Sequence, residues 1–381
     1  MDFDFHEDQE MLRKSAREFL STECPTSTLV REMESDPLGY SPELWRKIAD
    51  MGWLGIVFPE EYGGTGQKYM DLVVLLEEMG RSCVPGPFIS TMLCGLLILW
   101  AGNQQQKKSL LPDLINGNSV FALALLETGG RYSADAISLK AHQDRDNFIL
   151  NGTKMFVSDA HIANHFICIA RTINDQTQPE QGITLFVVDA TSPGLICSSL
   201  GDDTIARDKI FRIDFVDVQI ARNHILGELH LGWPFVEKLI NCGAVAECAR
   251  MLGGAKRVLE MSTAYAKERM QFGRPIGAFQ IIQHHLVDML TALEGSHYIT
   301  YQAAWKLDED LPCAKEVSMA KAWVNDAYYK ICINGHQIHG GIGFTQDHDI
   351  GLYFRRAKAQ EISYGDADFH RDKLAGQIGL I

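Results

Sequence analysis

The segment Phe211-Arg-Ile-Asp-Phe215 indicates a β-strand, because its apolar and polar residues alternate strictly. Successive side chains of a β-strand point to opposite faces, so the three apolar side chains would share one face of a sheet. Similar strand candidates lie between residues 119 and 223, at 120–126, 147–150, 166–170 and 184–188. We therefore predict a small β domain in the middle of the chain.

Helical patterns lie on both sides of this β region. From residue 7 to about 118, apolar residues recur at three- and four-residue spacing, as in Asp71-Leu-Val-Val-Leu-Leu-Glu-Glu-Met79. Beyond residue 232 the helical runs are longer, at 235–271, 279–306 and 313–336, with a last helix after Asp366. Separate blocks of helices and strands exclude an alternating parallel-sheet fold.

We therefore expect an α+β, mostly α fold with three domains. The N-terminal helical domain would cover residues 1–118, and a β-barrel-like middle domain would cover residues 119–225. A C-terminal four-helix bundle would cover residues 226–381.

The composition excludes several other classes of protein. The chain has 35 basic and 49 acidic residues and a formal charge of -14, which argues against a nucleic-acid partner. Its most apolar stretch, 92–100, is shorter than the roughly 20 residues that cross a bilayer. The acidic N-terminal stretch lacks the features of a secretory signal, so we expect a cytoplasmic protein. Nine scattered cysteines without a C-x-x-C pair indicate reduced thiols, and we expect no metal.

Glu247 is the first candidate for chemistry. It lies in Cys242-Gly-Ala-Val-Ala-Glu-Cys-Ala-Arg-Met-Leu-Gly-Gly-Ala255, a helical run with almost no other polar residue. A carboxylate with little water around it is suited to act as a general base. The alternative is a structural ion pair with Arg250, three residues further along the same helix face. The surrounding glycines and alanines allow either a ligand or a neighbouring helix to come close.

Two segments are candidates for binding an anionic ligand. In Arg269-Met-Gln-Phe-Gly-Arg-Pro-Ile-Gly-Ala-Phe-Gln280 one helix ends and the next begins. An arginine beside a helix N-terminus suits a phosphate or pyrophosphate, although a solvated helix end has the same pattern. The glycines of Gln337-Ile-His-Gly-Gly-Ile-Gly-Phe-Thr345 either let the backbone approach a ligand or form a helix C-cap before a loop.

Taken together, these segments resemble the acyl-CoA dehydrogenase family, and the resemblance covers essentially the whole chain. The family's R-x-x-F-G-x-P-I-x-x-F-Q stretch appears at 269–280, and its Q-x-x-G-G-x-G-[YF] stretch appears at 337–344. Further matches are Phe58-Pro-Glu-Glu-Tyr-Gly-Gly64 and Asn151-Gly-Thr-Lys-Met-Phe-Val-Ser158. The resemblance implies the same three-domain order, with FAD as the cofactor and an acyl-CoA as the substrate.

The resemblance also implies which residues bind FAD. Leu126 stands where most members have a hydroxyl that faces the flavin, and Phe156, Val157 and Ser158 would lie along the flavin ring. The pyrophosphate and adenosine would contact residues of two subunits: Arg269, Phe272 and Gln280 of one, and Gln337, Gly340 and Gly341 of its neighbour. FAD binding would therefore require at least a homodimer, and the family commonly forms a tetramer built as a dimer of dimers.

The resemblance implies a reaction, but the usual base is missing. Members remove the α-proton of an acyl-CoA thioester with a carboxylate while a hydride passes from the β-carbon to flavin N5. Electrons then pass to an electron-transfer flavoprotein. Most members carry the base as a glutamate directly before a glycine near the C-terminus, whereas here Tyr364 precedes Gly365. A tyrosine, with an ordinary pKa of about 10, is a poor base at neutral pH.

A minority of members carry the base on the helix that matches the segment of Glu247. We therefore expect Glu247 to be the catalytic base, with Gly243 and Tyr364 in the substrate pocket and Asp366 as the next candidate. The C-terminal segment resembles bacterial members of the family, some of which act on bulky or ring-bearing acyl groups.

Two other functions remain open from the sequence. A related flavoenzyme acting on a CoA thioester, such as an oxidase or a C–S lyase, would share these motifs. It would be distinguished by peroxide production or by product release without an electron acceptor. A non-catalytic subunit of a hetero-oligomeric dehydrogenase would explain the missing glutamate.

Overall fold

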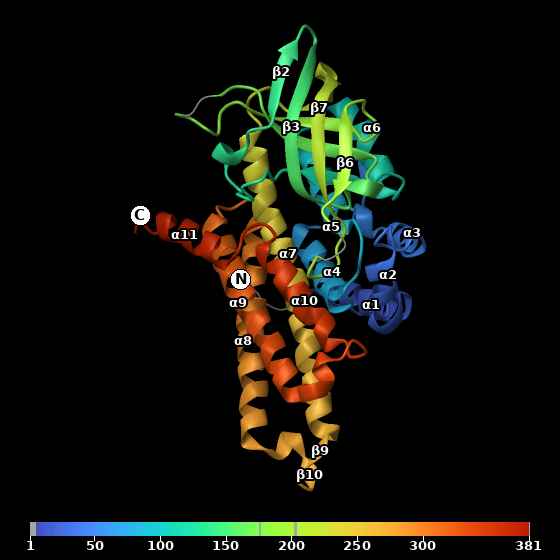
Figure 1. Cartoon of the computed structure of the whole chain (residues 1–381), viewed down its shortest axis with the longest axis vertical. Helices are drawn as coiled ribbons and strands as arrows, with labels where there is room; N and C mark the ends of the chain where they lie inside the picture. The colour runs from blue at the N-terminus through green and yellow to red at the C-terminus, as the bar shows by residue number, and fades with distance from the viewer. Residues whose placement is uncertain (1–4, 175–176, 202–203, 381) are drawn as a thin grey trace. The chain divides into compact units, whose positions relative to one another are not determined.

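The structure is a computed structural model, and it describes residues 5–174, 177–201 and 204–380. The chain forms two compact units that alternate along the sequence (Figure 1). The first unit contains Met1–Glu32, Lys68–Val84 and Gly243–Ile381. The second unit contains Met33–Gln67 and Pro85–Cys242.

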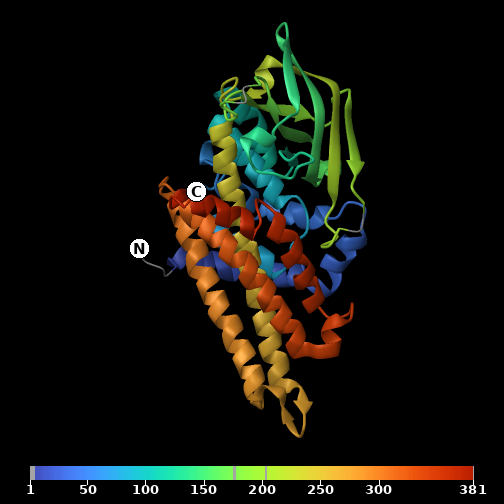
Figure 2. The same ribbon diagram turned by 60° about the vertical axis from the view of Figure 1, so that its left-hand side comes forward.

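The first unit is built almost entirely from helices. Its elements are α1 (Glu7–Glu23), α4 (Tyr69–Arg81), most of α7 (Trp233–Glu268), the hairpin β9 (Met270–Gln271) and β10 (Arg274–Pro275), α8 (Gln280–Asp308), α9 (Ala314–His339), α10 (Ile350–Ile362) and α11 (Ala367–Gln377). Figures 1 and 2 show α8, α9 and α10 running alongside this part of α7. Helix α9 packs against α8, α10 and α11, and α1 packs against α4.

Burial along these helices follows the helical period. In α9 the buried residues include Val317, Ala320, Val324, Tyr328 and Ile331, which recur every three or four positions. Helices α4 and α7 pack with their backbones in contact, since a Cβ on Gly253 would lie 1.8 Å from the carbonyl oxygen of Glu77. Part of the small-residue run around Glu247 is therefore explained by close helix packing.

The expected helices at 235–271, 279–306 and 313–336 are confirmed as α7, α8 and α9, and the helix after Asp366 is α11. Helix α10 was not predicted, yet it is the helix that lies alongside the other three (Figure 2). Its buried face includes Arg356 and Gln360, so the apolar period that identifies a helix from sequence is interrupted there.

The second unit combines short helices with a mixed sheet. Its main helices are α3 (Pro42–Asp50), α5 (Phe88–Ala101) and α6 (Gln104–Ile115). The strands are β1 (Phe121–Ala124), β2 (Lys140–Asp144), β3 (Asn147–Ser158), β4 (His165–Arg171), β5 (Ile183–Asp189), β6 (Leu195–Ser199), β7 (Ile210–Ala221) and β8 (Ile225–Leu226). The order across the eight-stranded sheet is β6-β7-β3-β2-β4-β5-β8, with β1 beside β4.

The alternation that predicted this sheet is confirmed in β7. Phe211, Ile213 and Phe215 are buried in the core of the unit, while Arg212 points outward. The middle domain, expected to be barrel-like, is a central sheet and not a closed barrel: within the described residues, β6 and β8 are the two ends of the sheet and do not pair. Strand β8 has two residues and β6 is mostly exposed, so neither edge offers a long partner for closure.

Across the described ranges, no helix is both long and apolar enough to cross a bilayer.

Candidate functional site

Glu247 lies on α7 within the first unit, and its side chain is only 7% exposed. Its Oε1 is 3.4 Å from a terminal nitrogen of Arg250, which is long for a charge-assisted hydrogen bond. Its Oε2 is buried, and no hydrogen-bond partner for it exists among the residues that the structure describes. The expected ion pair is therefore present, but it leaves one carboxylate oxygen unsatisfied.

A buried lysine lies within electrostatic reach of this carboxylate. Lys321 of α9 has no exposed surface, and its Nζ donates to Asn325 Oδ1 at 2.7 Å and to the carbonyl of Gln360 at 3.0 Å. Burial lowers the pKa of Lys321 to about 8, while the charges of Cys248 and Glu247 act in the opposite direction. Lys321 was not predicted as a site residue, although a lysine on the buried face of an amphipathic helix was a signal for it.

Gly243 and Tyr364, both expected in the substrate pocket, lie against each other. A Cβ on Gly243 would lie 2.5, 2.6 and 2.8 Å from three adjacent ring atoms of Tyr364. Nearly equal distances to three adjacent atoms mean that the face of the ring, and not its edge, covers this glycine. Gly243 and Glu247 are one helical turn apart on α7, so the Tyr364 ring lies one turn from the carboxylate.

Asp366, the alternative base, has a structural role. Its side chain accepts a hydrogen bond from the backbone N–H of Phe369 at 2.8 Å, and it is the N-cap of α11. The residue is exposed, in contrast to the buried Glu247.

The residues expected near the flavin ring come together in the second unit. The backbone N–H of Met155 donates to the carbonyl of Leu126 at 2.9 Å, which brings Leu126 beside the end of β3. The register of β3 against β7 shifts between Lys154 and Val157. At this bulge Phe156 has a φ of +57° and a side chain that is 49% exposed, while Val157 is buried and Ser158 is exposed.

A buried ion pair supports this region. Lys154 has no exposed surface, and its Nζ donates to Glu127 Oε1 at 2.8 Å and to the carbonyl of Leu125 at 3.0 Å. Burial acts to raise the pKa of Glu127, but the Lys154 ammonium and hydrogen bonds from Ser138 and Leu139 hold it below its usual value. Lys154 was not predicted as a site residue, although a lysine at an inward position of a strand was a signal for it.

The two segments expected to bind pyrophosphate and adenosine lie on exposed parts of the first unit. Arg269 precedes the β9–β10 hairpin, Phe272 lies in its turn and Gln280 begins α8, and all three are exposed. Gln337 is exposed near the end of α9, and a Cβ on Gly340 or Gly341 would meet no atom within 4 Å.

These residues fit an FAD molecule. In the second unit, an exposed aromatic ring and a hydroxyl at Phe156 and Ser158 suit a flat ring with polar edges. In the first unit, no described carboxylate pairs with the Arg269 guanidinium, which leaves it available to an anion. The open backbone at Gly340 and Gly341 allows close approach of a ligand.

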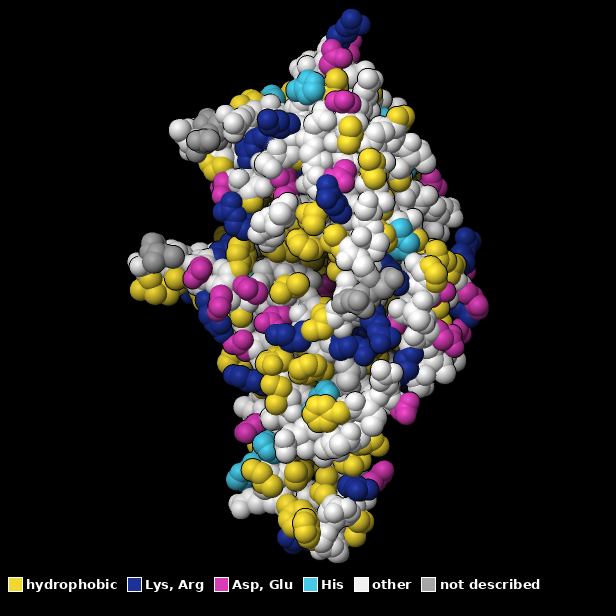
Figure 3. Space-filling view, viewed as in Figure 1, with side chains coloured by type: hydrophobic (Ala, Val, Ile, Leu, Met, Phe, Trp, Pro, Cys, Tyr) yellow, Lys and Arg dark blue, Asp and Glu magenta, His cyan; other side chains and the backbone are white. Residues whose placement is uncertain are grey.

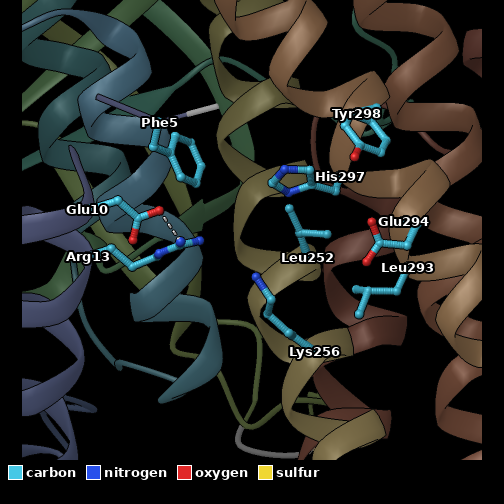
Figure 4. Close-up of a pocket in the computed structure, with 9 residues that line it drawn as sticks. All are labelled: Phe5, Glu10, Arg13, Leu252, Lys256, Leu293, Glu294, His297 and Tyr298. Carbon is cyan, nitrogen blue, oxygen red and sulfur yellow. Dashed lines mark hydrogen bonds and ion pairs between the residues drawn. The ribbon is translucent and has the colours of Figure 1, made fainter. Parts of the chain in front are cut away.

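A separate pocket of about 280 Å³ lies between α1, α7 and α8 of the first unit (Figure 4). One side carries Phe5, with Arg13 4.7 Å above its ring and hydrogen-bonded to Glu10. The other side carries His297 and Tyr298 of α8. None of the residues expected in the active site lines this pocket.

In the described parts of the chain, no group of three His, Cys, Asp or Glu side chains is arranged to hold a metal ion.

Comparison with known proteins defines the class to which this fold and site belong. The N-terminal, middle and C-terminal domain models of acyl-CoA dehydrogenase match residues 6–118, 122–217 and 230–379. The chain therefore belongs to the acyl-CoA dehydrogenase family, whose members are FAD-dependent oxidoreductases acting on acyl-CoA.

Individual relatives align along almost the full chain. The 3-(aryl)acrylate reductase of Clostridium sporogenes is 33% identical over 382 residues, which cover 98% of this chain and 99% of that protein. The caffeyl-CoA reductase-Etf complex subunit CarC of Acetobacterium woodii is 31% identical over 381 residues, covering 98% and 99%. The structure of butyryl-CoA dehydrogenase from Megasphaera elsdenii matches with a TM-score of 0.91 and 26% identity, covering 99% of this chain and 100% of that one.

Proposed function

We propose that this protein catalyses FAD-dependent α,β-dehydrogenation of an acyl-CoA thioester, with Glu247 as the base that removes the α-proton. The observation that carries the proposal is the buried Oε2 of Glu247, which no described residue hydrogen-bonds. Buried polar atoms are nearly always satisfied, so an exception calls for an explanation. If this carboxylate oxygen accepts the α-proton of the substrate, its lack of a hydrogen-bond partner among the described residues is explained.

Arg250 is a positioning residue in this proposal. Its long contact with Oε1 fixes the direction of the carboxylate and leaves Oε2 available. A pair with a purely structural role would more often satisfy both oxygens, as the bidentate pair of Arg17 and Glu78 does in the same unit. The ring of Tyr364 over Gly243 forms a wall of the acyl pocket beside the base.

FAD binding would involve three groups of residues. Leu126, Phe156, Val157 and Ser158 would contact the flavin ring, and Arg269, Phe272 and Gln280 would hold the pyrophosphate and adenosine together with Gln337, Gly340 and Gly341 of a neighbouring copy. When bound, FAD supplies the acceptor for the hydride that leaves the β-carbon of the substrate. The exposed hydroxyl of Ser158 and the guanidinium of Arg269, with which no described carboxylate pairs, support these assignments.

We further propose a homo-oligomer, a tetramer built as a dimer of dimers, in which each chain works as three domains, 1–118, 119–225 and 226–381. The boundaries of the matched family models support the division. Exposed apolar side chains support the assembly: Phe272 is 91% exposed and Phe344 is 79% exposed. Figure 3 shows apolar side chains gathered at the hairpin end of the bundle. Exposed apolar surface of this kind marks protein interfaces.

An electron-transfer flavoprotein is the proposed electron acceptor. Its support comes from the similarity to the caffeyl-CoA reductase-Etf complex subunit of Acetobacterium woodii.

The proposal is tested by adding a panel of acyl-CoAs to the FAD-loaded protein without oxygen and following the visible flavin absorbance. We expect the absorbance to bleach with at least one saturated acyl-CoA and the enoyl-CoA product to appear. Peroxide formed at the rate of substrate loss in air would favour an oxidase. Product released from the thioester without net flavin reduction would favour a lyase. A folded, FAD-loaded protein that reacts with no acyl-CoA would contradict a catalytic role.

A further inference from the structure

The chain segment that carries Tyr364 has an unusual backbone. Tyr364 and Gly365 both lie in the left-handed region, with φ of +56° and +101°. A Cβ on Gly365 would lie 2.3 Å from the Phe369 ring, so glycine is required there. A tyrosine in this region is strained and persists only when its surroundings determine its conformation.

Hydrogen bonds from buried polar groups hold the backbone of this segment in that conformation. The ring of His370 from α11 is 1% exposed, and its Nε2 donates to the carbonyl of Tyr364 at 2.9 Å. Its Nδ1 accepts from the hydroxyl of Ser318 on α9 at 3.4 Å. Just before the turn, Lys321 and Asn325 of α9 both donate to the carbonyl of Glu361 at 3.1 Å. The turn is thus tied to α9 on both sides, and the tyrosine ring is held in one place.

The ring is positioned to contact an acyl group. One part of its face covers Gly243, and the residue keeps partial exposure in the described structure. Glu247 lies one turn further along the same face of α7, about 6 Å away. An acyl group whose α-carbon reaches Glu247 therefore places its β-carbon and the group beyond it within reach of the Tyr364 ring.

We propose that Tyr364 is a specificity-determining residue that selects acyl-CoA thioesters carrying an aryl ring on the β-carbon. This inference rests on the proposed dehydrogenase function. An aryl group packs against a tyrosine ring in an offset or edge-to-face arrangement, which is worth about threefold to tenfold in affinity beyond the burial of its surface. A short alkyl chain gains no such contact. Two relatives are named for aryl or caffeyl substrates, which agrees with this class.

The experiment compares two thioesters on the FAD-loaded protein. We measure kcat/KM for 3-phenylpropionyl-CoA and butyryl-CoA, and by calorimetry the Kd values of the products cinnamoyl-CoA and crotonyl-CoA. We expect Tyr364→Leu, which keeps apolar volume without a π-face, to lower the aryl-to-alkyl ratio about tenfold in both measurements. Tyr364→Phe should keep the ratio. Tyr298→Ala, an exposed tyrosine of α8 outside the site, is the matched control and should also keep it.

The outcomes separate this inference from the function on which it rests. Equal losses for both thioesters in Tyr364→Leu, or an unchanged ratio, would overturn the role of Tyr364 while leaving the dehydrogenase proposal intact. If the wild-type protein oxidises neither these thioesters nor any other acyl-CoA of the panel, the proposed function fails, and the calorimetric ratio still decides on Tyr364. If Tyr364→Leu does not fold, Tyr364→Asn removes the ring with a residue that suits the left-handed backbone, and it carries the same expectation.

Discussion

At the scale of single residues, the environment of Glu247 distinguishes a proposed catalytic carboxylate from a structural one. Both Glu247 and Asp366 are carboxylates in the region of the proposed site, but they differ in how their oxygens are used. Asp366 caps a helix and is exposed, whereas Glu247 is buried and one of its oxygens has no hydrogen-bond partner among the described residues. A group that is removed from water and lacks a partner costs free energy in the folded state, so its retention is better explained by a reaction than by stability.

Glu247→Gln should abolish flavin reduction, with a loss of about 10²–10⁴-fold, because the amide keeps the shape of the side chain but does not accept the α-proton. Binding of acyl-CoA, measured by calorimetry, should remain. Asp366→Asn, which preserves the N-cap, is the matched control and should reduce flavin at close to the wild-type rate. The base assignment is wrong if the Glu247 variant stays active while the Asp366 variant is inactive.

At the scale of elements, two buried polar arrangements hold the loops that carry the proposed site. In the second unit, the pair of Lys154 and Glu127 fixes the segment after β1 against β3. In the first unit, His370 fixes the turn between α10 and α11. Both arrangements use charged or titratable groups that are buried away from water. Leaving such a group without its partner costs free energy in the folded state.

Lys154→Met should lower the free energy of unfolding by about 3–5 kcal/mol, because it leaves the Glu127 carboxylate without its cation. It should also weaken FAD retention, since Leu126 and the bulge of β3 lose their support. The double variant Lys154→Met, Glu127→Leu removes both charges and should recover part of the stability in urea unfolding. A single variant as stable as the wild type would show that the pair contributes little.

Stability should fall in acid partly through His370. Burial lowers the pKa of His370 to about 4, against 6.5 for an ordinary histidine. A lowered pKa means that the folded state takes up fewer protons than the unfolded chain between these values, so the contribution is complete above pH 6.5 and is lost as the pH falls toward 4. The loss is at most about 1.4 kcal/mol per pH unit. Urea unfolding of wild type and His370→Gln over this range should show a steeper decline for wild type, and parallel curves would exclude the effect.

At the scale of the whole molecule, we propose that assembly with a second copy completes the cofactor site. The exposed apolar residues of the first unit include Phe272 next to the exposed Arg269 and Phe344 next to the open glycines Gly340 and Gly341. The same segments that are expected to bind FAD therefore carry apolar surface suited to a partner copy. Cofactor retention and oligomer assembly should for this reason depend on each other.

Arg269→Ala should weaken FAD binding by roughly tenfold to hundredfold, the typical effect of losing a charge-assisted hydrogen bond, and should reduce oligomer assembly in parallel. Sedimentation velocity followed at both protein and flavin absorbance measures the two effects together. Arg274→Ala is the control on the same hairpin, because that guanidinium packs on the Phe279 ring at 4.2 Å. If the oligomer of the Arg269→Ala variant keeps full flavin occupancy, Arg269 does not contribute to FAD binding.

The sequence alone was enough to predict the α–β–α order, the helices α7, α8 and α9, and strands such as β7, since burial repeats within each element at its own period. Motif stretches at 269–280 and 337–344 were sufficient to indicate the family, which the comparisons show. These features depend on residues that are close together in the sequence, so they can be recognised without knowledge of the fold.

Features that depend on residues far apart in the sequence were visible only in the folded structure. It added α10, whose buried face includes Arg356 and Gln360, and it left the sheet open. It also placed the ring of Tyr364 over Gly243, because a left-handed turn held by His370 directs the side chain there. Whether a carboxylate such as that of Glu247 finds a partner depends on every element packed around it, and no pattern within one helix contains that information.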